Sequence, residues 1–443
     1  MRNRNSMSAT LSDYILAMRD AGAVKLYAKV LAPNDNSKNQ IYLAADPVRL
    51  AQIPSSEFYS DGKKPGILKA SLNLHWVALD GTLSAAPFSQ LIFYPQYPEV
   101  RLSGILKGTQ GAPNTVIASR DTGRFLMIGV TSSDLVLAVA GCSSDDLERF
   151  LEPETDKSGA SVLRAIRSDA GFTSQTLLLA SLKRIHETGW ISAKSLRADG
   201  SLVPCAGNRC VGHTLEAELG IPQNGVCGPD FLDWEIKAGT YKNYGKIQPA
   251  QAITLITPAP TGGLYRELGT ADFIRRFGYP AKSGTHDRLN FGGTFFYGVR
   301  EPNTGLTLDL PGYDLKSSSF PNGGGIALVT DTGDVAANWD LASLVTRWKS
   351  KHAFACYVPA ERDQADGSSF RYGNKIRLGT DPHIRYFFKS IVDGSVYLDP
   401  GLKLEGAGSG KPRTKERHQF RVRNIDLSRL YGNFWETDLL SLG

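Results

Sequence analysis

The sequence contains no apolar run approaching the ~20 residues that a membrane-spanning helix needs, and its first residues include no apolar signal-peptide core. It contains neither a P-loop nor a GxGxxG fingerprint, and its seven histidines show no HExxH or HNH-like spacing. These observations argue against a protein that binds nucleotides through one of these common motifs and against a nuclease with a histidine-based metal site. We expect a cytoplasmic protein with no membrane partner and no ATP or nucleotide cofactor.

Cysteine is scarce, and no CxxC pair occurs among Cys142, Cys205, Cys210, Cys227 and Cys356. Because cytoplasmic proteins keep their thiols reduced, we expect these five residues to be free thiols. Cys205 and Cys210, with His213 and Cys227 nearby, suggest a zinc site as an alternative. Their irregular spacing favours small buried thiols instead.

The chain of 443 residues is too long for one ordinary domain, and its 41% hydrophobic and 21% charged residues are typical of a globular protein. The net charge of +6 does not by itself indicate a nucleic-acid partner. Near the C-terminus only Glu405 and Glu416 oppose a basic cluster of Lys403, Lys411, Arg413, Lys415, Arg417, Arg421 and Arg423. The cluster is either a phosphate-binding surface or a solvated charge run. The alternation of Phe420 and Val422 with polar residues favours a strand with one polar face.

Residues up to about 145 consist of short strand-like runs separated by turn residues, a pattern that predicts an all-β barrel. The runs cover residues 24–30, 40–43, 74–78, 89–93, 99–102, 124–130 and 134–140, after an entry helix over 10–19. A helix over 144–151 and a polar stretch over 152–160 follow. We therefore predict a β-barrel domain over residues 1–150, a linker over 151–172 and a second domain over 173–443.

The segment over residues 230–237 has a pattern suited to a divalent metal. Asp230 is followed five residues later by Glu235, and Lys237 comes two residues after that. In an extended chain, residues two apart share a face, so Glu235 and Lys237 are expected to point the same way. Two carboxylates suit Mg²⁺, and a nearby lysine can orient or deprotonate a water for attack on phosphorus. The pattern predicts a nuclease.

Two other segments have similar spacing. Asp309, Asp314 and Lys316 repeat the pattern, but the intervening Pro-Gly breaks a strand. Asp61 and Lys63 flank a glycine in a polar, turn-like cluster. Neither is expected to form a flat face with two ligands. By contrast, a short helix over 213–220 precedes the 230–237 segment and adds a third acid, Glu216.

Residues 208–224, together with Asp230 and the Glu-Ile-Lys step, resemble the core of the MvaI/BcnI restriction endonucleases, relatives of the MutH mismatch-repair nickase. In that family a helix glutamate precedes the metal-binding aspartate by fourteen positions, the spacing from Glu216 to Asp230. The resemblance implies a PD-(D/E)xK α/β fold, a mixed sheet flanked by helices. It implies that Lys237 activates water, that Glu216 supports the site, and that the metal lies at Asp230, Glu235 and Ile236.

The resemblance extends from about residue 173 to the C-terminus, through an apolar helix over 175–186 and a strand over 353–358. In the family a late His/Arg segment reads guanines, and an arginine fork matches the O6 and N7 acceptors of guanine. The resemblance therefore makes His418, Arg421 and Arg423 candidate base readers. Lys411 and Arg413 are candidate phosphate contacts.

Two N-terminal segments, over residues 29–40 and 98–107, resemble the DNA-gripping arms of the B3-like effector domains of EcoRII-type restriction enzymes. The resemblance implies DNA contacts by Lys29, Asn34, Asn36, Lys38, Arg101 and Lys107. A structural loop and an ordinary strand remain the alternative, because Asn-rich turns need no ligand.

These patterns together predict a magnesium-dependent type II restriction endonuclease that cuts double-stranded DNA at a short specific sequence. The resemblance implies a monomer, with a cognate DNA methyltransferase as a partner in the same system. Two alternatives stay open: a MutH-like nickase or repair endonuclease, and a non-catalytic DNA-binding protein.

Overall fold

The computed structural model describes residues 9–32, 40–142, 147–151, 163–166, 173–207, 209–223, 229–242, 252–281, 287–351, 354–365 and 367–442. The chain divides into two compact units. Unit 1 consists of residues 1–61 and 67–177, and unit 2 consists of residues 62–66 and 178–443. No helix in the described ranges is long and apolar enough to cross a membrane.

Unit 1 is built around two sheets. The strands of the first, in spatial order, are β11 (Arg164–Ala165), β1 (Ala23–Val30), β9 (Arg124–Thr131), β10 (Val136–Cys142), β5 (Leu74–Val77) and β6 (Leu83–Ala85). Those of the second are β2 (Ile41–Ala44), β8 (Glu99–Ser103), β7 (Gln90–Tyr94), β4 (Lys64–Ser71) and β3 (Tyr59–Asp61). The helical segments are α1 (Leu11–Asp20), η1 (Pro47–Leu50), α2 (Asn114–Ala118) and η2 (Leu147–Phe150).

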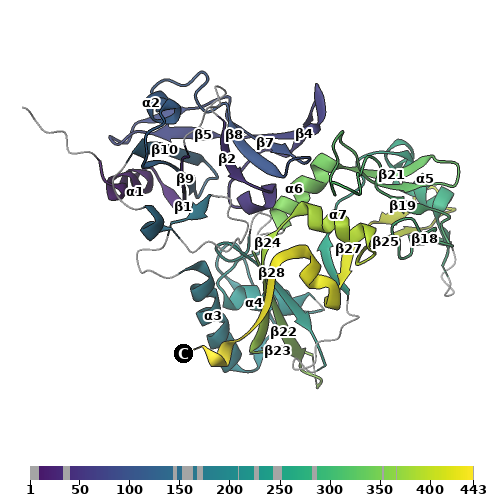
Figure 1. Ribbon diagram of the computed structural model, residues 1–443. Helices are drawn as coiled ribbons and strands as arrows, with labels where there is room; N and C mark the ends of the chain where they lie inside the picture. Colours follow the sequence, from purple (N-terminus) through teal and green to yellow (C-terminus); the bar gives the residue numbers. More distant parts are fainter. Residues whose placement is uncertain are drawn as a thin grey trace, which may run out of the picture. The chain divides into compact units, whose positions relative to one another are not determined.

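Helix α1 covers the first sheet of unit 1 (Figure 1). A capping box starts the helix: Asp13 N donates to Thr10 Oγ1, and Thr10 N donates to the Asp13 carboxylate at 2.8 Å. Leu11 and Met18 then pack on Phe125 and Met127 of β9, a strand that is buried along its whole length. The predicted strands of this region are confirmed, whereas the closed barrel is not, because strand pairing in the described residues forms two sheets.

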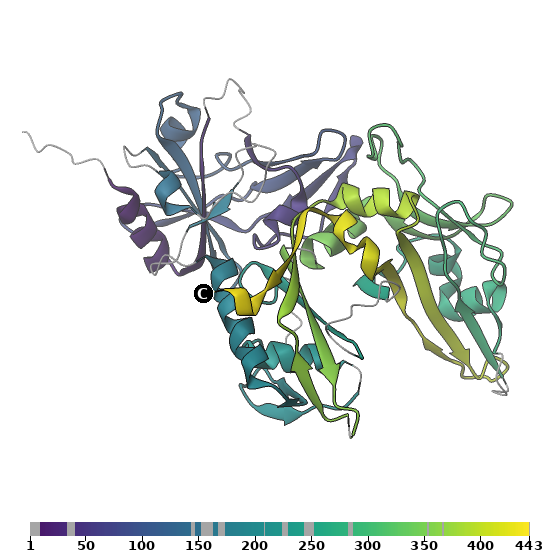
Figure 2. The same ribbon diagram turned by 60° about the horizontal axis from the view of Figure 1, so that its bottom comes forward.

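Unit 2 contains a mixed sheet that carries the candidate site. Its strands in order are β12 (Ile191–Ser192), β23 (Ser369–Tyr372), β22 (Phe354–Arg362), β24 (Lys375–Pro382) and β28 (Tyr431–Asp438), and β15 (Trp234–Thr240) pairs with β22. Helices α3 (Ser174–Thr188) and α4 (Cys210–Glu218) pack on one face (Figure 1). Figure 2 shows α3, in teal, beside the green strands of this sheet. The hairpin β13 (Lys194–Leu196) and β14 (Leu202–Pro204) precedes α4.

A second sheet of unit 2 carries the late basic segment. Its strands in order are β16 (Ala252–Ile256), β27 (His418–Arg423), β25 (Val396–Glu405), β18 (Arg288–Gly292) and β17 (Tyr279–Pro280), and β26 (Arg413–Lys415) pairs with β25. A small sheet consists of β19 (Thr307–Asp309), β20 (Gly325–Val329) and β21 (Val335–Asp340). The remaining helical segments are α5 (Leu264–Phe277), α6 (Leu341–Lys351), α7 (Ile384–Val392), η3 (Asn424–Leu430) and η4 (Leu439–Ser441).

The expectation that all cysteines are free thiols is wrong. A disulfide joins Cys205 and Cys210, whose Cα atoms lie 5.8 Å apart. The pairing arises because the chain turns from β14 into α4 within a few residues, which brings the two side chains together. Cys142 and Cys356 are free, and Cys227 lies outside the described residues. The disulfide also removes Cys205 and Cys210 from the alternative zinc site.

The range predicted as a linker, 151–172, contains part of the unit 1 sheet. Ala165 and Arg164 in β11 pair with Tyr27 and Ala28 in β1, and Leu151 forms a bridge with Ile166. We predict that a fragment ending at residue 166 unfolds in urea with one cooperative transition, because the unit has a hydrophobic core of its own. A fragment ending at residue 150, without β11, should have a lower urea midpoint. Equal midpoints would show that β11 adds nothing to unit 1.

Candidate active site

The alternation of side chains along β15 separates a core face from a polar face. Trp234 and Ile236 are buried in a hydrophobic core of unit 2, among residues of α3, α4 and β22. Glu235 and Lys237 lie on the opposite face, as the sequence predicted. Parallel pairing places Glu235 beside Ala355 and Lys237 beside Tyr357.

A tight turn precedes this strand. Phe231 and Trp234 form both backbone hydrogen bonds of a two-residue hairpin, with Trp234 N donating to Phe231 O at 2.8 Å and Phe231 N to Trp234 O at 2.9 Å. Leu232, in the turn, has a φ of 52°, a left-handed conformation that is strained for a residue with a Cβ. The first half of the 230–237 segment is therefore a turn, and its second half is the strand β15.

The turn brings Asp230 back to the strand that it precedes. The Asp230 Oδ2 atom accepts a hydrogen bond from the backbone N–H of Ile236 at 2.9 Å. This bond fixes the carboxylate beside the middle of β15, close enough to Glu235 to raise the pKa of that side chain. Asp230 therefore reaches the site through a hairpin and not along an extended strand.

Glu235 is a buried carboxylate, and one of its two oxygens accepts a hydrogen bond. Its Oε1 accepts a hydrogen bond from Lys237 Nζ at 3.1 Å, and the side chains are 8% and 20% exposed. Its buried Oε2 has no hydrogen-bond partner among the described residues. Burial, with the charge of Asp230 adding to it, raises the pKa of Glu235, and the positive charges of Lys237 and Lys351 only partly oppose this shift.

The ammonium of Lys237 lies among negative and polar groups. Burial alone would lower the pKa of Lys237, but the charges of Glu235, Tyr357 and Asp230 outweigh burial and raise it. Lys237 is thus a cation at neutral pH. Such a group can hold a water or a phosphate oxygen by hydrogen bonds and offset negative charge.

Two buried tyrosines that the sequence did not indicate lie beside the lysine. The hydroxyls of Tyr357, on β22, and Tyr431, on β28, form a 2.7 Å hydrogen bond. The register places Lys237, Tyr357 and Arg377 in one row across three strands. No local pattern could reveal this row, because its members come from distant parts of the chain.

The donor set fits Mg²⁺. One buried carboxylate oxygen of Glu235 has no partner among the described residues, and the carboxylate of Asp230 is close enough to raise the pKa of Glu235. Mg²⁺ is usually held by one or two carboxylates, with waters and substrate phosphate completing the shell. The described residues contain no cluster of three or more His, Cys, Asp or Glu side chains that could hold a metal. Ile236 contributes its N–H to Asp230, and its side chain belongs to the core.

Glu216 lies on α4, and its side chain is engaged elsewhere. Its Oε2 is 3.3 Å from Nδ1 of His213, one turn earlier on the same helix. Within the described ranges no hydrogen bond or ion pair connects Glu216 with Asp230, Glu235 or Lys237. The structure thus brings together three of the four predicted catalytic residues.

The competing acidic segments do not form such a site. The Asp314 carboxylate accepts hydrogen bonds from Lys316 N at 3.0 Å and from Ser317 Oγ at 2.7 Å, which makes it the anchor of a turn. These bonds, the one from Ser317 first, lower the pKa of Asp314. Asp61 forms an ion pair with Lys69 at 2.9 Å.

The candidate base readers do not all lie on one face of β27. Arg421 Nη1 donates to Asp399 Oδ2 at 2.6 Å, and Arg423 Nε donates to Asp426 Oδ2 at 3.0 Å. Both belong to the more exposed face of the strand. His418 is 7% exposed and lies on the face of the buried Phe420 and Val422.

His418 is held inside unit 2 by neighbours on α5 and β21. Its Nε2 is 3.2 Å from the hydroxyl of Tyr265, and its ring lies edge-on to the rings of Tyr265 and Trp339. Burial lowers the pKa of His418 despite the opposing charge of Glu416. The ring is thus a neutral, packed side chain on the face opposite to Arg421.

The other predicted DNA contacts differ in exposure. Lys411, Arg413 and Lys107 are exposed, whereas Arg101 is engaged by Glu99 at 3.0 Å. Lys29 is 7% exposed and donates to the carbonyl of Tyr42 at 2.8 Å, and burial lowers the pKa of Lys29 to about 8. Asn34, Asn36 and Lys38 lie outside the described residues.

The mixed sheet of unit 2, with helices on one face and the acidic residues and lysine on the other, is that of a restriction endonuclease fold. Residues 179–431, more than half of the chain, match the model of the MvaI/BcnI restriction endonuclease family. The chain belongs to this family.

Two solved structures are also similar to the chain. Restriction endonuclease MvaI in complex with its cognate DNA substrate is 20% identical over 60% of this chain and 98% of its own, with a TM-score of 0.43. MvaI in the absence of DNA is 19% identical over 60% of this chain and 98% of its own, with a TM-score of 0.34. No curated protein matches the chain.

The tyrosine pair gives a prediction about stability. Replacing Tyr357 or Tyr431 alone by Phe leaves one buried hydroxyl without a partner, which should cost about 1–3 kcal/mol. The double Phe variant should lose much less than the sum of the two single variants. Urea unfolding of the four proteins measures this coupling, and strictly additive losses would show that the hydroxyl bond contributes nothing.

Proposed function

We propose that the chain is a magnesium-dependent type II restriction endonuclease that hydrolyses phosphodiester bonds of double-stranded DNA at a short specific sequence. The observation that supports this proposal best is the cluster of Asp230, Glu235 and Lys237. Two carboxylates and an ammonium meet there on one face of a sheet, within the part of the chain that matches a restriction endonuclease family. One buried carboxylate oxygen of Glu235 has no hydrogen-bond partner within the part of the chain that the structure describes.

The residues of the cluster have complementary roles in this reaction. Asp230 and Glu235 would hold Mg²⁺, which supplies an acidified water and offsets charge on the phosphate. Lys237, kept cationic by its neighbours, holds the attacking water in line with the departing 3′-oxygen. The hydrogen bond from Ile236 fixes Asp230, so that the carboxylate does not need to reorganise during the reaction.

Sequence recognition is assigned to the exposed face of β27. The side chain of Arg421 is 26% exposed and donates hydrogen bonds to Asp399 and to the carbonyl of Ala252. The side chain of Arg423 donates a hydrogen bond to Asp426. A guanidinium held by two partners loses little conformational freedom when its free N–H groups meet a guanine. Lys411 and Arg413 would contact phosphates. We further propose that unit 1 binds DNA and that the protein acts as a monomer beside a cognate methyltransferase.

Incubation of supercoiled plasmid with the protein and Mg²⁺ tests the reaction. Linear product supports a restriction endonuclease, stable nicked circles support a single-strand nickase, and unchanged DNA contradicts catalysis. Sequencing the ends from a random DNA library then gives the target site.

The cluster of Asp230, Glu235 and Lys237 gives a prediction about catalysis. Asp230→Ala and Lys237→Ala should each reduce cleavage by at least two orders of magnitude, because they remove groups that stabilise the transition state. DNA affinity, measured by gel shift, should change little. Asp314→Ala is the matched control, since Asp314 anchors a turn, and it should cleave normally. If Asp314→Ala is inactive and Asp230→Ala still cleaves, the catalytic site includes Asp314 and does not include Asp230.

The exposed face of β27 gives a prediction about recognition. Arg421→Ala should lose about 1–3 kcal/mol of discrimination at one guanine, whereas Lys411→Ala should weaken binding to all sequences and flatten its salt dependence. Competition binding with single-base-pair variants of the site measures both. His418→Ala should lower stability and leave the base preference unchanged, because the ring is buried on the opposite face. A selective loss at one base pair in His418→Ala would contradict this placement.

A further inference from the structure

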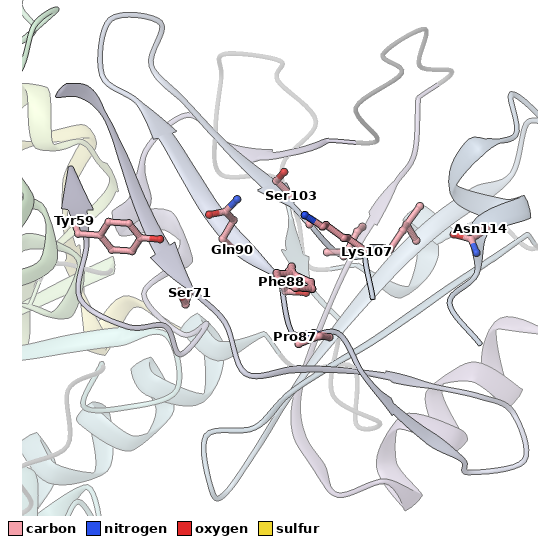
Figure 3. A pocket seen from close by; sticks show the side chains of 12 residues that line it. Tyr59, Ser71, Pro87, Phe88, Gln90, Ser103, Lys107 and Asn114 are labelled. Carbon is pink, nitrogen blue, oxygen red and sulfur yellow. The ribbon is translucent and has the colours of Figure 1, made fainter. Parts of the chain in front are cut away.

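A cavity in unit 1 has no role in the site described above. Its volume is about 700 Å³, within the range of small-molecule pockets. The walls come from the starts of β3 and β7, the ends of β4 and β8, and the loop after β8. Figure 3 shows Phe88 in the middle of the lining, between Tyr59 on one side and Asn114 on the other. We propose that this cavity binds one unpaired nucleotide, with its base on Phe88 and its phosphate at Lys107.

Phe88 offers an aromatic surface that its neighbours hold in place. The side chain is 52% exposed although it is apolar. Gly104 has a φ of 75°, and a Cβ there would lie 1.9 Å from the carbonyl oxygen of Phe88. Gly108 has a φ of 71°, and its Cβ would lie 2.9 Å from the Phe88 ring. Two glycines therefore let the loop close against Phe88 while leaving much of the ring accessible. An exposed, fixed ring suits base stacking.

The charge of the lining favours an anion. The twelve lining residues include one lysine and no aspartate or glutamate. The Nζ atom of that lysine, Lys107, lies 4.8 Å from the centroid of the Phe88 ring. A base stacked on this ring would take the place of the ammonium, which would then lie within reach of the phosphate of the same nucleotide. Phe88 can stack on a flat aromatic group while Lys107 pairs with a neighbouring anion, so together they suit a ligand that has both.

Polar groups that can read a base edge surround the ring. Ser89 is 2% exposed, and its Oγ has no hydrogen-bond partner among the described residues. A buried hydroxyl without a partner is costly, and a ligand group would satisfy it. Gln90 and Asn114 add amides that both donate and accept hydrogen bonds, and Ser71 and Ser103 add hydroxyls. This lining is more polar than that of a pocket for an apolar ligand.

The inference rests on the proposed function, because DNA is then the source of the nucleotide. A base rotated out of a duplex and a free mononucleotide present the same chemistry, a stackable ring with a phosphate. Two arms of one experiment separate these sources. Both use the full chain in metal-free buffer, so that no DNA is cut.

In the first arm, fluorescence anisotropy compares binding of a labelled duplex that carries one bulged nucleotide with binding of the fully paired duplex. The unmodified protein should prefer the bulged duplex. Phe88→Leu should reduce this preference roughly 5- to 150-fold, whereas Phe88→Trp should keep it, because stacking needs a ring. Tyr97→Leu is the matched control, since Tyr97 is 64% exposed in the same unit and does not line the cavity. Lys107→Gln should weaken binding of the bulged duplex. It should also make the plot of log affinity against log salt concentration less steep, by about the slope of one phosphate contact.

In the second arm, deoxynucleoside monophosphates are titrated against the same proteins. Binding that Phe88→Leu abolishes supports the nucleotide site with a free nucleotide as its ligand, even if bulged DNA is not preferred. A preference that survives in Phe88→Leu, or failure of both probes to bind in a Phe88-dependent way, overturns the inference. Plasmid cleavage by the unmodified protein is measured in parallel. Cleavage without a nucleotide site would leave the proposed function standing, and absence of cleavage would contradict the proposed function by itself.

Discussion

The parallel pairing of β15 with β22 is the constraint on which the candidate site depends. It runs from the Trp234–Phe354 pair to the Thr240–Ala360 pair without a shift in register. A slip by one residue would move Glu235 into the core and Trp234 onto the polar face. The large buried side chain of Trp234, in the core with α3 and α4, therefore fixes which face the acid and the lysine occupy. Packing on one side of the sheet thus positions the chemistry on the other.

The sequence predicts part of this arrangement. A period of two between Glu235 and Lys237 is a local property, and the strand with both side chains on one face is confirmed. The hairpin that returns Asp230 is not predictable, because Leu232 occupies a left-handed conformation in which Gly or Asn is expected. Tyr431 and the Cys205–Cys210 disulfide were also missed, since tertiary packing and not local pattern creates these contacts.

The same period of two separates residues that the family resemblance had grouped. His418 is two residues from Phe420 and three from Arg421, so a strand must place it on the side of Phe420. The buried alternation of His418, Phe420 and Val422 along β27 shows this arrangement. The motif matched a set of residue types, whereas the strand geometry decides which of them can reach a common ligand. Arg421 and Arg423 share the more exposed face of β27, and His418 lies on the buried face.

The energetics of Glu235 link stability to catalysis. A buried carboxylate oxygen without a partner destabilises a fold by about 1–3 kcal/mol, and Lys237 satisfies only the other oxygen. The strained Leu232 adds to this cost in the turn that places Asp230. Folding alone would not favour either feature, so the core opposite must supply the stability that they remove. A cation that binds only the folded chain would offset the cost, since binding and folding are then thermodynamically linked. The buried Glu235 and the strained Leu232 thus lie close to each other in the chain, at the start of β15.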